Sequence, residues 1–186
     1  MLGLGNPGAE YEHTRHNAGA DAVVLLAARH GLVLRAERRA HALAAESVVR
    51  GRRLVVAVPT TYMNDSGLAA SACVRRFSVA DPGRLVVVHD ELDLPVGTVR
   101  VKRGGGTAGH NGLKSLQSHL HSTEFVRVRI GIGRPPGRMS GADYVLRRPS
   151  RADGEALAVA CELAADSVEM VLDEGPEAAM NAVNGR

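Results

Sequence analysis

The strongest constraint on the fold is the stretch RLVVV at residues 84–88, which changes abruptly into the polar stretch HDELDLP. A continuous apolar run is typical of a central strand that is buried on both faces. Further strand patterns occur at 42–50, 53–58, 97–103 and 125–132. Helical patterns occur at 17–31, about 65–77, 113–120 and 153–173, and a short one follows Pro176.

Strands that alternate with helices predict an α/β fold, here a three-layer sandwich with a mixed central sheet surrounded by helices. The length of 186 residues suits a single domain over 1–186. Hydrophobic residues make up 45% of the chain, so a core can form without disulfides or metals. Cys73 and Cys161 lie in alanine-rich, helix-like stretches, and we expect both to be buried free thiols.

The net charge of +3 permits an anionic partner but does not require one. No apolar run approaches the roughly 20 residues that cross a membrane. No basic segment followed by an apolar stretch marks a signal peptide at the N-terminus. The sequence therefore predicts a cytoplasmic protein without membrane association.

The first motif, GLGNPG at residues 3–8, matches the spelling of a dinucleotide-binding turn. Such a turn follows a strand, opens a helix and has an acidic residue about 20 positions further on. Here only two residues precede Gly3, Pro7 occupies a variable position, and the acidic residue is missing. A nucleotide-dependent oxidoreductase is therefore disfavoured.

Polar clusters follow three of the predicted strands, at 6–8, 60–64 and 89–93. Ligand sites of open α/β sheets lie beyond the carboxyl ends of the strands. His16 lies in such a loop and could act as a general base, with Asp90 as the carboxylate that fixes its tautomer. The alternative for His16 is a surface or core histidine without a chemical role.

The chain shows no obvious protein nucleophile, because it lacks G-x-S-x-G and both cysteines are predicted to be buried. Water is then the expected attacking species of a hydrolase. His13 and His16 form H-x-x-H, and HDELD adds potential metal ligands. Without a third clearly oriented histidine or cysteine, we expect no metal site.

Side-chain amides and cations complete the candidate residues. Asn6, Asn64 and Asn111 lie in separate loops, where amides could bind a peptide backbone or stabilise an oxyanion, or simply suit the turns. Lys102 and Arg103 precede a run of glycines, which is either an anion cradle or a flexible basic loop. Arg129 lies on the next strand and is predicted to face the same way as Lys102, with no acid nearby, which suits a phosphate.

Six stretches resemble one family. They are GLGNPGAEY with TRHNAG, VPTTYMNDSG, VHDELDLPVG, GGGTAGHNGLKS, VRIGIGRPP and DYVL, in the family's order over about residues 3–146. On these motifs the chain resembles bacterial peptidyl-tRNA hydrolase. The resemblance implies a monomeric α/β enzyme that needs no cofactor or metal. The reaction that the resemblance implies is hydrolysis of the ester between a peptide and the 3′-terminal ribose of tRNA.

The resemblance also implies roles for individual residues. His16 would be the base that activates water, Asp90 would orient and polarise it, and Asn6 would position substrate and water. The implied substrate-binding residues are Tyr11, Met63, Asn64, His110 and Asn111. In the same way, Lys102 and Arg129 match the family's clamp on the tRNA 5′-phosphate, which makes the acceptor arm and the peptide the expected partners.

The chain departs from the family pattern at three places. Only Met1 and Leu2 precede the first glycine, Asp65 replaces an apolar residue, and Ala108 replaces a common glycine. The alternative function is a catalytically inactive RNA-binding module of the same fold. The intact His16 and Asp90 argue against it, since a binding module would not need them.

Overall fold

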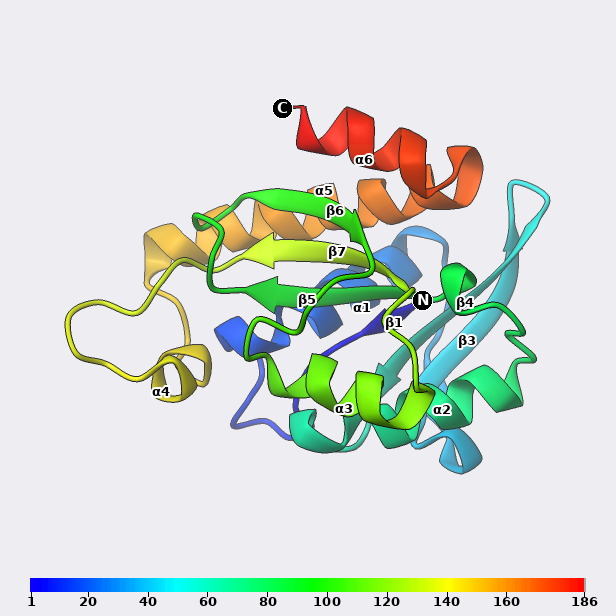
Figure 1. Cartoon of the computed structure of the whole chain (residues 1–186), viewed down its shortest axis with the longest axis horizontal. Coiled ribbons are helices and arrows are strands. Elements are labelled where there is room, and N and C mark those ends of the chain that lie inside the picture. Colours follow the sequence, from blue (N-terminus) through cyan, green and yellow to red (C-terminus); the bar gives the residue numbers. More distant parts are fainter. Residues whose placement is uncertain (186) are drawn as a thin grey trace.

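The computed structural model describes residues 1–185 and contains a seven-stranded mixed sheet (Figure 1). The strands are β1 (Leu2–Gly3), β2 (Arg35–Glu37), β3 (Ala42–Val49), β4 (Arg52–Pro59), β5 (Val86–Glu91), β6 (Val99–Arg103) and β7 (Val126–Gly131). Their order across the sheet is β2-β3-β4-β1-β5-β7-β6. The four central strands β4, β1, β5 and β7 run parallel, and β2, β3 and β6 pair antiparallel at the two sides.

Helices cover both faces of this sheet. They are α1 (Ala18–Arg29), α2 (Ser66–Arg76), α3 (Asn111–Leu120), α4 (Gly141–Val145), α5 (Arg151–Glu174) and α6 (Pro176–Asn184). One apolar cluster joins the sheet to α1, α5 and α6, and a second joins it to α2 and α3. In the view of Figure 1, α5 and α6 lie above the central strands and α3 lies below them. The predicted three-layer α/β sandwich is confirmed.

The central strand β5 is longer than its apolar run. It continues through His89, Asp90 and Glu91, and all six of its residues are buried. Its pairing with β7 continues over these residues, because Asp90 lies opposite Ile130 and Glu91 lies opposite Gly131. The polar residues expected in a loop after this strand therefore form its carboxyl end.

The start of α1 is pressed against this strand. A Cβ atom on Gly19 would lie 2.2 Å from the carbonyl oxygen of Val88, so only glycine allows the contact. The helix ends as its sequence predicts, because Gly31 has a φ of +63° and Leu32 donates back to the carbonyl of Ala27 at 2.8 Å. This close approach places the residues just before α1 beside the carboxyl end of β5.

The remaining elements largely follow their patterns. Arg50 and Gly51, with φ values of +51° and +76°, form the tight turn of the β3–β4 hairpin. The short β2 and α4 were not expected from the sequence.

Cys73 and Cys161 are buried and free, as predicted. Within residues 1–185, no helix combines the length and apolar character needed to cross a membrane.

Candidate active site

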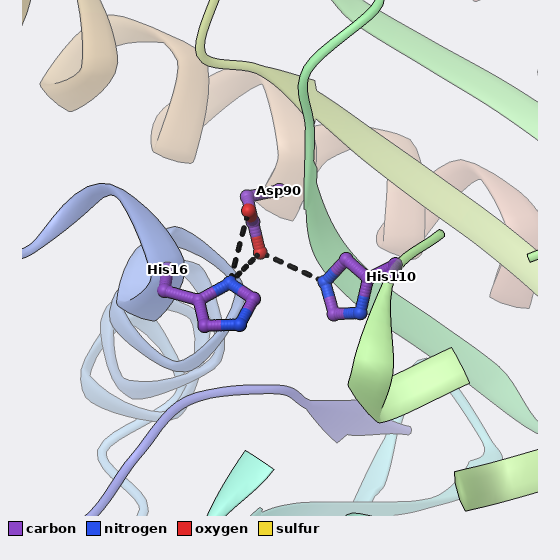
Figure 2. A group of neighbouring side chains, drawn as sticks. All are labelled: His16, Asp90 and His110. Atoms are coloured by element: carbon purple, nitrogen blue, oxygen red, sulfur yellow. Dashed lines mark hydrogen bonds and ion pairs between the residues drawn. The ribbon is translucent and has the colours of Figure 1, made fainter. Parts of the chain in front are cut away.

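His16 and Asp90 lie in direct contact at the carboxyl end of β5 (Figure 2). His16 belongs to the 3-10 turn η1 (Arg15–Asn17), which leads into α1. Its Nδ1 lies 2.9 Å from one carboxylate oxygen of Asp90 and 3.0 Å from the other. An ionised carboxylate only accepts hydrogen bonds, so Nδ1 carries the proton. Nε2 of His16 therefore keeps its lone pair and can accept a proton.

A second imidazole contacts the same carboxylate. Nε2 of His110 lies 2.9 Å from Oδ1 of Asp90, and the rings of His16 and His110 lie 5.0 Å apart (Figure 2). His110 is the N-cap of α3, where its Nδ1 accepts from the backbone N–H of Leu113 at 3.4 Å. The cap fixes the tautomer of His110 with its proton on Nε2, pointing at Asp90.

The carboxylate of Asp90 remains ionised in this environment. Burial by itself raises the pKa of Asp90, which is only 2% exposed, but His110 and His16 lower it more strongly through charge and hydrogen bonds. The net effect holds the pKa of Asp90 well below its usual value. A permanent anion thus faces His16, which stabilises the imidazolium that forms when His16 accepts a proton.

His89 supports the group from within the strand and was not singled out from the sequence. Its Nδ1 donates to the backbone carbonyl of Asp90 at 2.7 Å, and its ring meets that of His110 edge-on at 5.1 Å. Burial, and secondly the nearness of His110, lower the pKa of His89 to about 3. A neutral His89 therefore packs against the ring of His110. His89 directly follows the apolar run at 84–88, so its place in the sequence does not distinguish a functional histidine from a core residue.

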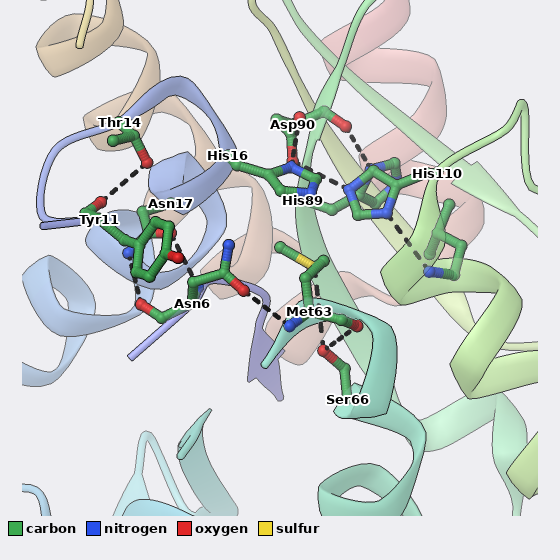
Figure 3. Close-up of polar contacts among 11 residues, drawn as sticks. Asn6, Tyr11, Thr14, His16, Asn17, Met63, Ser66, His89, Asp90 and His110 are labelled. Carbon is green, nitrogen blue, oxygen red and sulfur yellow. Dashed lines mark hydrogen bonds and ion pairs between the residues drawn. The ribbon is translucent and has the colours of Figure 1, made fainter. Parts of the chain in front are cut away.

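Asn6 is held beside His16 by two sets of bonds (Figure 3). Its Oδ1 accepts from the backbone N–H of Met63 at 2.7 Å. The side chain of Asn17 bonds both backbone groups of Asn6, at 2.8 and 2.9 Å. These bonds leave Nδ2 of Asn6 directed toward His16. GLGNPG is thus a strand-to-loop turn that presents an amide, and Asn17 is a supporting residue that its sequence position did not reveal.

A cavity of about 210 Å³ opens beside the His16–Asp90 pair. Its walls come from the end of β5, the start of α3 and the helix α4. The lining residues are His16, Asp90, Glu91, Leu92, Ala108, Gly109, His110, Asn111, Gly141, Ala142 and Val145. His16, Asp90 and His110 therefore face a space that can admit part of a substrate.

The other predicted substrate-binding residues lie at different depths. Asn111 is exposed and lines the cavity. Met63 is buried beside Asn6, whereas the next residue, Asn64, is exposed. Tyr11 is half-buried, with its ring edge-on to Tyr62 at 6.3 Å. The structure thus brings Asn111 into the cavity, while Tyr11 and Asn64 lie outside its lining.

The predicted cations lie on one face of neighbouring strands. Lys102 of β6 pairs with Arg127 of β7, so Lys102 and Arg129 are diagonal neighbours on the same face. The expectation that no acid lies near them is wrong, since Nη1 of Arg129 lies 3.6 Å from a carboxylate oxygen of Glu91. Glu91 lines the cavity, and this ion pair therefore connects Arg129 to the His16–Asp90 region.

The side chain of Arg127 holds the glycine loop between β6 and α3 through hydrogen bonds. This buried guanidinium donates to the carbonyl oxygens of Gly106 and Gly105 at 2.6 and 2.5 Å. Ala108 adopts a φ of +47°, a left-handed conformation that costs a residue with a Cβ about 1–2 kcal/mol. The departure from glycine at this position thus adds strain to the loop.

His16, Asp90 and His110 also have the ligand types of a metal site, with one ligand atom from each all lying within 4.8 Å of one another. The gaps of 2.9 and 3.0 Å from the nitrogens to the carboxylate are hydrogen-bond distances. Ligand atoms around one tetrahedral zinc stand about 3.4 Å apart. His13 of the H-x-x-H pattern instead contacts Asp21 at 3.3 Å and is exposed. The arrangement fits shared protons better than a shared ion.

Comparison with known proteins shows which family the chain belongs to. The family model described as peptidyl-tRNA hydrolase matches residues 1–186. The chain belongs to the peptidyl-tRNA hydrolase family. It is 48% identical over 184 residues to the peptidyl-tRNA hydrolase of Rhodococcus jostii (strain RHA1), covering 99% of this chain and 96% of the relative. It is 51% identical over 181 residues to that of Frankia alni, covering 97% and 91%.

Solved structures of peptidyl-tRNA hydrolases have the same fold. A crystal structure of the enzyme from Acinetobacter baumannii matches with a TM-score of 0.92 and 35% identity, covering 98% of this chain and 92% of that one. The family resemblance drawn from the motifs is thus confirmed. The glycines of GLGNPG lead into turns at residues 8–13 rather than directly into a helix, unlike a dinucleotide-binding turn.

Proposed function

We propose that this peptidyl-tRNA hydrolase uses His16 as a general base, held by Asp90, to hydrolyse the ester between a peptide and the 3′-terminal ribose of tRNA. The observation that carries the proposal is the paired contact of His16 Nδ1 with both carboxylate oxygens of Asp90. It fixes the protonated nitrogen on the buried side and the basic nitrogen, Nε2, on the other.

The reaction follows from this tautomer. Nε2 of His16 takes a proton from water as the water oxygen attacks the ester carbonyl, and Asp90 stabilises the resulting imidazolium. The negative charge that develops on the carbonyl oxygen requires donors, which Asn6 Nδ2 and the amide of Asn111 can supply. When the intermediate collapses, the imidazolium returns its proton to the ribose 3′ oxygen. The products are free tRNA and a peptide with a carboxylate.

The peptide and the tRNA would occupy different sides of the cavity. Asn64, Tyr11 and Met63 lie on the side of the Asn6 turn, where they would contact the peptide. Lys102 and Arg129 would bind the 5′-phosphate of the acceptor arm. Two observations support this assignment. Lys102 and Arg129 lie on the same face of β6 and β7, and Lys102 is exposed with its Nζ next to Gly105 of the glycine loop.

His110 would flank the base rather than react, because its proton points at Asp90 and its other nitrogen caps α3. The proposed chemistry involves only side chains and water, without a cofactor or metal. We further propose that the enzyme acts as a monomer in the cytoplasm, where its substrate is produced.

The decisive experiment replaces His16 by alanine and measures single-turnover hydrolysis of a peptidyl-tRNA analogue. The rate should fall about 10²–10⁴-fold, the usual contribution of a general base, while tRNA affinity stays near wild type. The matched control is His13→Asn, which removes the exposed histidine of the same H-x-x-H pattern and should retain activity. Undiminished turnover by the His16→Ala enzyme would exclude the base. A wild-type enzyme that binds tRNA without turnover would instead favour the inactive RNA-binding module.

A further inference from the structure

Three consecutive residues of η1 each hold a different part of the molecule. His16 contacts Asp90 of β5, and Asn17 bonds the backbone of Asn6. Arg15 reaches in another direction, to the segment that joins α4 to α5. The single turn that carries the proposed base is therefore tied to the molecule on three sides. The role of Arg15 is not accounted for by the chemistry described above.

Arg15 makes four contacts with its side chain. Nη1 donates to the carbonyl oxygens of Arg147 and Arg148 at 3.3 and 3.0 Å, and Nη2 donates to Asp153 at 2.9 Å. The guanidinium carbon lies 4.3 Å from the centre of the Tyr144 ring. The backbone N–H of Arg15 adds a bond to the carbonyl of Arg147 at 3.3 Å. All of these partners belong to α4, to the first turn of α5 or to the link between them.

The side chain is only 8% exposed, so these bonds form largely out of water. Burying a charge is costly unless it is paired and hydrogen-bonded. Nη1 and Nη2 meet this requirement by bonding two carbonyls and a carboxylate while the plane stacks on an aromatic ring, whereas Nε has no partner among the described residues. A lysine carries the same charge but has neither the fork nor the flat face. The contacts of Arg15 are therefore specific to arginine.

One partner of Arg15, Tyr144, belongs to a helix that borders the cavity. Tyr144 lies in α4, and Gly141, Ala142 and Val145 of the same helix line the cavity together with His16 and Asp90. Arg15 thus joins the turn that carries His16 to a helix that lines the cavity. A shift of η1 by a fraction of an ångström would change the direction of His16 Nε2 relative to the space between them.

We propose that Arg15 is a positioning residue, which fixes η1 against the α4–α5 segment so that His16 points its basic nitrogen into the cavity. The proposal rests on the proposed function, in which His16 is the base. It assigns Arg15 an effect on the rate of the chemical step, because misplacing a catalytic group by about 1 Å can cost about 10²-fold. Binding of tRNA does not depend on this contact.

The first test compares Arg15→Met and Arg15→Lys with wild type well below their melting temperatures. Arg15→Met should lower kcat about 10–100-fold with KM and tRNA affinity within about twofold. Arg15→Lys should recover only part of the loss, since it restores charge without the fork. Unchanged kcat in Arg15→Met, or a loss confined to KM, would overturn the proposal.

The second test asks whether Arg15 acts through His16, using a double-mutant cycle on the single-turnover rate. In a His16→Ala background, Arg15→Met should change the residual rate by less than about twofold, because the base to be positioned is gone. A merely structural role predicts the same fold loss in both backgrounds, and that result would refute positioning. If His16→Ala alone keeps full activity, the proposed function fails instead, so the two failures are distinguishable.

Two further variants separate positioning from general destabilisation. Arg29→Met removes ion pairs of α1 with Glu162 and Asp166 of α5, so it loosens the same helix pair away from His16. It should lower the melting temperature while leaving kcat unchanged. If Arg15→Met does not fold, Asp153→Asn removes only the carboxylate partner of Arg15. A smaller loss of kcat that disappears in the His16→Ala background supports the proposal, and full activity rejects it.

Discussion

The imidazole rings of His16 and His110 lie 5.0 Å apart, each with a nitrogen 2.9 Å from the same carboxylate oxygen of Asp90. The two rings differ in what fixes them. The backbone N–H of Leu113 fixes the tautomer of His110, whereas the contacts of Nδ1 with the carboxylate define the tautomer of His16. A change at Asp90 should therefore alter the two histidines unequally.

Replacing Asp90 by asparagine should reverse the tautomer of His16. The amide has one acceptor oxygen, and His110 must take it because its proton is held on Nε2. The amide NH2 then replaces Oδ2, which lies 3.0 Å from Nδ1 of His16, and this donor favours the tautomer in which Nδ1 accepts over the one in which it donates to the shared oxygen. The proton moves to Nε2, the base is lost, and we expect turnover to fall about 10³–10⁴-fold.

Single-turnover hydrolysis measures this loss, and a tRNA-binding assay shows whether substrate still binds. The control is Asp93→Asn, which changes an exposed acid of the same HDELD stretch that pairs with Arg134. It should behave as wild type. An Asp90→Asn enzyme with a rate close to wild type would mean that the carboxylate does not determine the tautomer of His16.

Substitution of the proposed phosphate clamp should change the salt dependence of tRNA binding. Lys102→Ala and Arg129→Ala each remove one charged contact, worth about 1.5 kcal/mol or roughly a tenfold loss of affinity. The slope of log K against log salt should become shallower by about 0.7–0.9 per variant. Titration at several salt concentrations measures both quantities.

Arg53→Ala provides the control for this titration. Arg53 lies at the start of β4, where it pairs with Glu46 on a strand remote from β6 and β7. It should keep the wild-type slope. The clamp would be refuted if Lys102→Ala and Arg129→Ala bound tRNA like wild type at every salt concentration.

Acid should destabilise the protein partly through His89. Burial holds the pKa of His89 at about 3 in the folded state, against about 6.5 in the unfolded chain. The folded pKa is the lower one, so the contribution of His89 to stability is complete above pH 6.5. It is lost as the pH falls from 6.5 toward 3, because only the unfolded chain takes up the proton there. The expected slope approaches about 1.4 kcal/mol per pH unit.

Urea unfolding at several pH values between 7 and 4 tests this dependence. His89→Gln should be less stable at pH 7 but should lose less stability on acidification than wild type. His121→Asn, at an exposed left-handed position that asparagine tolerates, should keep the wild-type slope. Parallel curves for wild type and His89→Gln would show that His89 is not responsible.

Both thiols should be inert in the folded protein. Burial raises the pKa of Cys73 to about 11 and that of Cys161 to about 12, so the reactive thiolate is scarce at pH 8. Ellman's reagent should react slowly with the native protein and rapidly with both cysteines in denaturant. Immediate reaction of a native thiol would contradict this burial.

The sequence by itself determined the layers and most elements, because hydrophobic periodicity and turn residues are local. The run at 84–88 indicated the central strand, the pattern at 17–31 indicated α1, and the patterns at 42–50 and 53–58 indicated β3 and β4. It also placed His16 and Asp90 as a pair, since residues at the carboxyl ends of parallel strands meet at one edge. Family motifs extended this to Asn6 and His110.

Only the tertiary structure decided how these groups are held. The extension of β5 through Asp90 depends on pairing with β7, a strand about 40 residues away that no local pattern reveals. Likewise, the burial of His89, the ion pair of Glu91 with Arg129 and the contacts of Arg15 with residues 147–153 join distant segments. Hydrogen bonds and desolvation act through space rather than along the chain, so a residue's chemical role becomes definite only when the fold supplies its neighbours.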